Sequence, residues 1–150
     1  MYNAFLLTLI SATRQAASVY LKNRVHKSYY IDPSRQRPDQ IAIPESDRTA
    51  LKANIFPLII AEASKSISVQ LANTLRSIIS HDFPEKWPEL ANNVKSLLGS
   101  SNVREVVAGC TALLEITKIY RQVIQHTSKN YISLICELAI AKILTFLKKL

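Results

Sequence analysis

Residues 81–90, "HDFPEKWPEL", place an aspartate, two prolines and the only tryptophan between two apolar stretches with helical spacing. A proline disfavours helical geometry in the residue before it, so Pro84 predicts that a helix ends at Phe83. Asp82 is then positioned to cap the next helix, whose apolar stripe begins at Trp87. A catalytic pair formed by Asp82 and Glu85 is the weaker interpretation, because capping and a favourable helix-dipole position explain both carboxylates. The stretch therefore predicts an elbow between helices, built from Asp82, Phe83, Pro84, Trp87 and Pro88.

Before this elbow, apolar residues recur at helical spacing almost from the start of the chain. A first helix is expected over residues 2–10, leading into a second over residues 11–30. Three prolines in residues 31–44 then predict an exposed loop, since no helix can span them.

Two more helices are expected between this loop and the elbow. Pro44 and Ser46 supply the start of one, and Pro57 predicts a kink inside it. The other begins near Ser64 or Ser66. Their predicted buried stripes are Leu51, Ile55, Leu58 and Ile59 in the first, and Ile67, Leu71, Leu75, Ile78 and Ile79 in the second.

After the elbow, Gly99 ends one helix and Ser101 or Asn102 caps the next. Gly109 lies inside that next helix at a cost of about 1 kcal/mol in helix propensity, which predicts a close helix crossing beside it. A last helix is expected from Ser128 onward. The predicted stripes are Trp87, Leu90, Val94, Leu97 and Leu98; then Val103, Val106, Val107, Cys110, Leu113 and Leu114; then Tyr131, Leu134, Leu138 and Phe146.

The spacing of these helices suggests a repeat. Trp87 and Tyr131 lie 44 residues apart in successive first helices, and Leu75 and Leu113 lie 38 apart in successive second helices. Two-helix units of roughly 40–47 residues are typical of HEAT-type repeats. We therefore predict an all-α fold, a right-handed α-solenoid of antiparallel helix pairs whose second helices line the concave wall. An irregular helical bundle is the alternative.

Composition agrees with a helical chain and limits its function. Hydrophobic residues make up 48% of the 150 residues, and glycine occurs only twice. The net charge of +8 is spread over the chain, with seven basic and four acidic residues in 1–50, five and four in 51–100, and seven and three in 101–150. This distribution argues against direct nucleic-acid binding.

The cysteines and histidines are too scattered to predict a disulfide framework or a zinc site, and the two cysteines, Cys110 and Cys136, favour a reducing compartment. The longest apolar stretch, "ISLICELAIAKILTFL", contains Glu137 and Lys142, so membrane insertion is not expected. No Gly-rich phosphate loop or nucleophile elbow is present. We expect no catalytic residues, no bound metal and no cofactor.

Two stretches resemble a known family. "RQAASVYLKNRV" (residues 14–25) and "HDFPEKWPEL" resemble two signatures in the N-terminal region of the importin-beta (karyopherin-beta) superfamily, which consists of HEAT-repeat nuclear transport receptors. "AIPESDRTALKANIFPLI" (42–59) followed by "SVQLANTLRSII" (68–79) looks most like the importin-seven and importin-eight branch and its fungal relatives. The resemblance covers about Ala4 to Arg121, in the order the family has.

This resemblance implies a function that helix spacing alone does not indicate. It implies binding of the GTP form of the GTPase Ran and import of protein cargo, shuttling between cytoplasm and nucleus. Cargo and nucleoporins would bind through the rest of a longer receptor, of which residues 1–150 would be an N-terminal segment of about three helix pairs plus a last helix. The alternative is a HEAT-type protein-interaction scaffold unrelated to transport.

In the family, Ran lies against the second helices of the N-terminal repeats. Carried onto this sequence, those helices are residues 12–27, 66–81 and 102–121. Their polar positions outside the stripes are the candidate Ran contacts: Arg14, Lys22, Asn23, Arg24, Gln70, Asn73 and Arg76.

Overall fold

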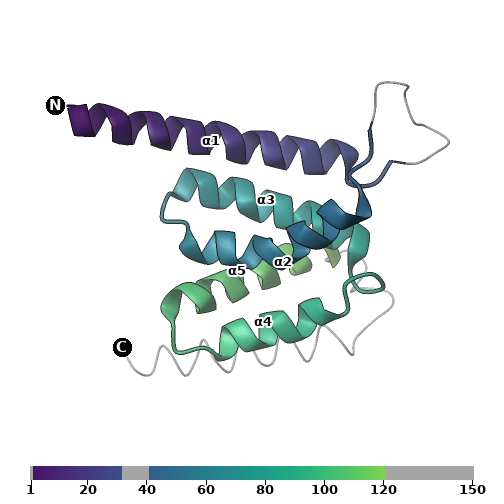
Figure 1. The fold of residues 1–150 in the computed structure, drawn as a ribbon. Coiled ribbons are helices and arrows are strands. Elements are labelled where there is room, and N and C mark those ends of the chain that lie inside the picture. Colours follow the sequence, from purple (N-terminus) through teal and green to yellow (C-terminus); the bar gives the residue numbers. More distant parts are fainter. Residues whose placement is uncertain (1, 32–40, 121–150) are drawn as a thin grey trace. The chain divides into compact units, whose positions relative to one another are not determined.

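A computed structural model describes residues 2–31 and 41–120, and every regular element within them is a helix (Figure 1). The helices are α1 (Tyr2–Ser28), α2 (Glu45–Ala61), α3 (Lys65–Asp82), α4 (Glu89–Gly99) and α5 (Val103–Tyr120). The chain divides into two compact units, residues 1–81 and 82–150. The last predicted helix, with Tyr131, Leu134, Cys136, Leu138 and Phe146, lies outside the described residues.

Helix α1 corrects the first sequence prediction. Residues 2–28 form one continuous helix, not a helix over residues 2–10 followed by another. The apolar pattern changes near Ile10, but the chain there contains neither proline nor glycine, so nothing interrupts the ladder of backbone hydrogen bonds.

In the first unit, α1 and α3 run parallel, side by side (Figure 1). Near their starts, Ser66 Oγ donates a hydrogen bond to Gln15 Oε1 at 2.8 Å. Near their ends, the His81 ring stacks against the rings of Tyr29 and Tyr30, with centroids 5.9 Å apart in both pairs. Helix α2 runs in the opposite direction. It begins beside the end of α1, and Glu62, which directly follows its last residue, forms an ion pair with Arg14 of α1.

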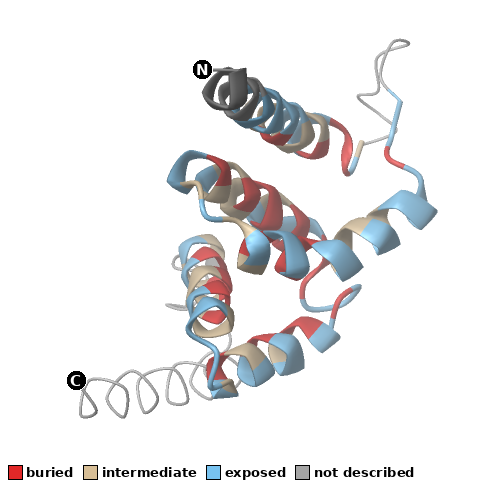
Figure 2. Ribbon diagram, turned by 60° about the vertical axis from the view of Figure 1, so that its left-hand side comes forward, coloured by how far each residue is buried: buried red, intermediate tan, exposed pale blue. Residues whose placement is uncertain are grey.

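Buried apolar side chains from all three helices form the core of this unit (Figure 2). The predicted stripe of α3 is confirmed, since all five of its residues are buried. On α2, Ile55 and Ile59 are buried as predicted, but the prediction for Leu58 is wrong: its side chain is 46% exposed. Helix α2 continues through Pro57 as one element.

The connection from α1 to α2 is only partly described, because residues 32–40 lie outside the described residues. Ile41 is exposed, as expected for this loop, but Ile43 is buried. The Ile43 N–H donates to the Ser28 carbonyl oxygen at 2.9 Å, so the chain is tied to the end of α1 just before α2 begins. Pro44 occupies the N-cap position of α2.

The second unit begins at the predicted elbow. Helix α3 ends at Asp82, and residues 83–86 form a turn containing a cis peptide bond between Phe83 and Pro84. The prediction that Asp82 caps the next helix is wrong. Helix α4 starts seven residues later, with Pro88 at its N-cap position and no side-chain capping bond. Asp82 is buried, and its carbonyl oxygen accepts the Lys86 N–H at 2.7 Å.

Helices α4 and α5 cross closely at Gly109, as the sequence predicted. A Cβ added to Gly109 would lie 3.0 Å from Leu98 Cγ and 3.1 Å from Leu97 Cβ. Helix α5 begins with a side-chain cap, since Asn102 Oδ1 accepts the Arg104 N–H at 3.0 Å. This observation selects Asn102 over Ser101 as the cap.

The predicted buried stripe of α5 is wrong. Val103, Val107 and Leu114 are each more than half exposed, and the buried face consists of Ala108, Gly109, Ala112, Glu115 and Ile116. At Gly109 the absence of a side chain lets Leu97 and Leu98 of α4 approach closely, and many such atom-pair contacts add up to a large dispersion attraction. Helix α5 therefore buries its small residues and leaves Val103 and Val107 exposed.

The all-helical architecture of the described residues agrees with the predicted HEAT-repeat class.

Candidate functional site

The candidate contact residues lie on α1 and α3, but their side chains do not form one group. An α-helix turns by about 100° per residue, so Arg14, Lys22, Asn23 and Arg24 point from α1 in different directions. Their surroundings differ accordingly. Arg14 and Arg24 have partners within the first unit, and Arg76 also takes part in an interaction. The side chains of Lys22, Gln70 and Asn73 have no partner within residues 10–31 and 41–119.

Arg14 is held at the junction of α2 and α3. Its guanidinium forms an ion pair with Glu62, whose carboxylate also accepts the Ser64 N–H at 2.7 Å. The bond from Ser64 lowers the pKa of the Glu62 carboxyl below its ordinary value; burial acts in the opposite direction, and the Arg14 charge lowers it further. Arg14 thus links α1 to the short segment that connects α2 and α3.

Arg24 is held at the other end of α1. Its Nη1 donates to the Ile41 carbonyl oxygen at 2.8 Å. This bond and the one from the Ile43 N–H fasten the segment before α2 to α1. Arg24 therefore has a structural partner of its own.

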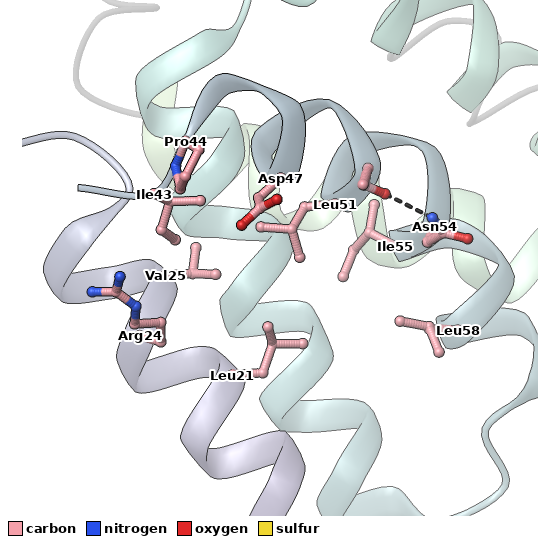
Figure 3. A pocket seen from close by; sticks show the side chains of 11 residues that line it. Leu21, Arg24, Val25, Ile43, Pro44, Asp47, Leu51, Asn54, Ile55 and Leu58 are labelled. Atoms are coloured by element: carbon pink, nitrogen blue, oxygen red, sulfur yellow. Dashed lines mark hydrogen bonds between the residues drawn. The ribbon is translucent and has the colours of Figure 1, made fainter. Parts of the chain in front are cut away.

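An apolar groove of about 370 Å³ lies between α1 and α2 (Figure 3). Leu21 and Val25 line it from α1, Ile43 and Pro44 from the connecting segment, and Leu51, Ile55 and Leu58 from α2. Arg24, Asp47, Ala50 and Asn54 complete its lining, and Asn54 Nδ2 donates to the Ala50 carbonyl oxygen at 2.8 Å. Such a groove suits apolar side chains and offers no arrangement for catalysis.

Sequence reasoning missed this groove, although it had placed three of the lining residues, Leu51, Ile55 and Leu58, in one apolar stripe. Stripes predict which side of each helix faces the core, but not where two packed helices leave an opening. The exposure of Leu58 is the visible sign of that opening.

Lys22, Gln70 and Asn73 are half-buried, and none of their side chains has a hydrogen-bond or ion-pair partner within residues 10–31 and 41–119. The backbone carbonyls of Gln70 and Asn73 accept the hydroxyls of Thr74 and Ser77, and these bonds do not involve the side-chain amides. Asn23 and Arg76 are exposed. The side chains of Lys22, Gln70 and Asn73 carry hydrogen-bond donors, whereas Arg76 already takes part in an interaction.

The elbow residues differ in their exposure. Trp87 is 5% exposed and Phe83 is also buried, while Pro84 and Pro88 lie at the surface. A tryptophan buried to this extent packs inside its own chain and is not a recognition aromatic.

Neither a metal site nor a membrane-spanning helix is found in the part of the chain that the structure describes. There, no three His, Cys, Asp or Glu side chains gather closely enough to hold a metal ion. None of the helices described is both long and apolar enough to cross a bilayer.

Comparison with known proteins gives a consistent assignment. Residues 8–61, which include most of α1 and all of α2, match the family model of the Importin-beta N-terminal domain. Importin-8 of Homo sapiens is 35% identical over 112 residues, which cover 71% of this chain and 10% of the relative. Importin-8 of Danio rerio is 34% identical over 111 residues, with 71% and 10% covered. Exportin-2 of Homo sapiens is 30% identical over 125 residues, with 80% and 12% covered.

The chain thus spans about a tenth of the length of the curated relatives it matches. No solved structure matches it. The relatives include both importins and an exportin, and the family consists of transport receptors, not enzymes. The similarity to Importin-8 confirms the branch suggested by residues 42–59 and 68–79. This chain therefore belongs to the importin-beta superfamily of nuclear transport receptors and corresponds to its N-terminal region.

Proposed function

We propose that residues 1–150 are an N-terminal HEAT-repeat segment of a nuclear transport receptor that binds Ran in its GTP form through α1 and α3. The observation that carries the proposal is the match of residues 8–61 to the Importin-beta N-terminal domain. Donors on α1 and α3 without internal partners support it, since a protein partner would use them. The segment acts by binding alone, without catalysis, cofactor or membrane insertion.

In this proposal the complete receptor shuttles between cytoplasm and nucleus and imports protein cargo. Cargo and nucleoporins bind the rest of the receptor, and Ran binding at this end is coupled to cargo release. Such coupling is reciprocal, so cargo and Ran-GTP weaken each other's binding by the same factor. Repeated helix pairs contact only their neighbours, which allows a change in curvature at one end to reach the other.

The test is binding of the purified chain to Ran loaded with a non-hydrolysable GTP analogue and, in parallel, with GDP. Binding of the GTP form alone supports the proposal. Equal binding to both forms, or to neither, contradicts it and favours the scaffold alternative. Import is separated from export by measuring whether Ran-GTP releases the cargo of the complete receptor or is needed to bind it.

A further inference from the structure

The groove between α1 and α2 belongs to an apolar face of the first unit that is exposed to solvent (Figure 3). Leu58, inside the groove, is 46% exposed. Tyr20 and Ile41 are each 71% exposed, the highest values among the large apolar side chains of the described residues. Ile41 lies beside the groove, because its carbonyl oxygen accepts the bond from Arg24, a lining residue. Exposed apolar patches of this kind mark interaction sites.

The face carries a projecting side chain next to a hollow. Tyr20 precedes Arg24 by four residues, so the two side chains are neighbours on α1. Because Arg24 lines the groove, the exposed Tyr20 ring stands at its edge. The groove has a volume of about 370 Å³ and a mostly apolar lining, which suits an aromatic ring. A face of this form can pair with itself across a twofold axis, since each copy then fills the groove of the other.

The two charged residues that line the groove have opposite signs. Arg24 reaches it from α1 and Asp47 from α2 (Figure 3). Arg24 has five N–H donors, of which Nη1 bonds to the Ile41 carbonyl oxygen. Neither Arg24 nor Asp47 forms an ion pair with another described residue. In a twofold contact, Arg24 of each copy can meet Asp47 of the other, which gives two equivalent ion pairs.

We propose that this face is a homodimer interface, in which Tyr20 of each copy enters the groove of the other and Arg24 pairs with Asp47 across the axis. Tyr20 exposes roughly 100–180 Å². Even with Ile41 and Leu58, the apolar area of each copy stays below the roughly 800 Å² per partner of a stable complex, so the dimer is weak and forms only at high protein concentration. The inference goes beyond the proposed function and does not rest on it.

The test is analytical ultracentrifugation of the unaltered chain at increasing protein concentration, which gives the dissociation constant of the dimer. We expect Tyr20→Ala to raise this constant roughly tenfold or more, because a buried aromatic commonly carries much of the binding energy of an interface. Leu114→Ala is the matched control, since Leu114 is 52% exposed on α5 in the other unit. It should leave the constant unchanged. Far-UV circular dichroism checks that both variants keep their helices.

Charge reversal tests the twofold arrangement. Arg24→Asp and Asp47→Arg each place like charges opposite one another in both ion pairs, so each variant alone should dimerise more weakly than the unaltered chain. An equimolar mixture of the two variants restores opposite charges in both pairs. The mixture should therefore associate more tightly than either variant by itself.

Three results would overturn the inference. The first is a chain that stays monomeric at every concentration, including one whose groove then binds an added amphipathic peptide, since the occupant would be another protein. The second is a dimer that Tyr20→Ala leaves unchanged. The third is a mixture of the charge variants that associates no better than its components. Ran-GTP binding, measured separately on the unaltered chain, decides the proposed function whatever the outcome here.

Discussion

Gly109 provides the sharpest test of the packing between α4 and α5. Replacing glycine by alanine inside a helix normally stabilises it by about 1 kcal/mol. Here the added Cβ would lie 3.0 Å from Leu98 Cγ and 3.1 Å from both Leu98 Cδ2 and Leu97 Cβ. Leu98 is buried, and the Cβ of Leu97 is attached directly to the α4 backbone, so relief requires α4 itself to move.

Overpacking of this kind costs about 1–3 kcal/mol, which exceeds the propensity gain. We therefore expect Gly109→Ala to destabilise the second unit by about 1 kcal/mol net. For a chain of this size that corresponds to a fall of about 2–4 °C in the melting temperature. Urea unfolding and thermal melting, both followed by far-UV circular dichroism, measure the effect.

Gly99→Ala is the matched control within the same unit. Gly99 ends α4, its backbone does not adopt a positive φ, and nothing lies within 4 Å of an added Cβ. This variant should be neutral or more stable by up to about 1 kcal/mol. A Gly109→Ala protein as stable as the unaltered chain would refute the close crossing, as would equal effects of the two substitutions.

Three further predictions concern single side chains. Trp87→Ala should cost about 3–5 kcal/mol in unfolding free energy, because it removes the buried aromatic of the elbow; the urea midpoint should fall clearly below that of Trp87→Phe, and equal midpoints would contradict the packing role. Glu62 has a folded-state pKa below its ordinary 4.5, so its contribution to stability is complete above that pH and is lost as the pH falls through the lower folded value. Glu62→Gln should therefore be less stable near neutral pH and lose less stability on acidification, whereas Glu89→Gln, an exposed change, should keep the original pH profile. Asn102→Ala should cost about 0.5–2 kcal/mol through loss of the α5 cap, and Asn102→Asp, which keeps the acceptor, should restore most of it in the same urea assay; failure of Asp to do so would count against capping.

Much of the local structure was predictable because it depends on neighbouring residues. The spacing of apolar residues in α3 placed all five of its core side chains correctly, and Pro84 marked the end of that helix to within one residue. Gly109 predicted the crossing, since a glycine kept inside a helix usually makes room for a neighbour. The residues from 121 onward lie outside the described part, so the prediction of a last helix stays a prediction.

The errors have separate physical causes. The buried face of α5 was assigned to its valines, and the structure buries Ala108 and Ala112. The number of apolar residues on a face measures its hydrophobicity, but the depth to which a neighbouring helix approaches depends on side-chain size. Asp82 was assigned as a cap from its residue type and position, yet a turn of several residues separates it from α4.

The candidate site, too, could be predicted from the sequence only in part. The sequence alone determined the helical class, the elbow and the family, because all three depend on residue types in a fixed order along the chain. Only the tertiary structure decided that Arg14 and Arg24 are held by internal partners. The physical reason is that these hydrogen bonds and ion pairs depend on distances between residues far apart in the chain.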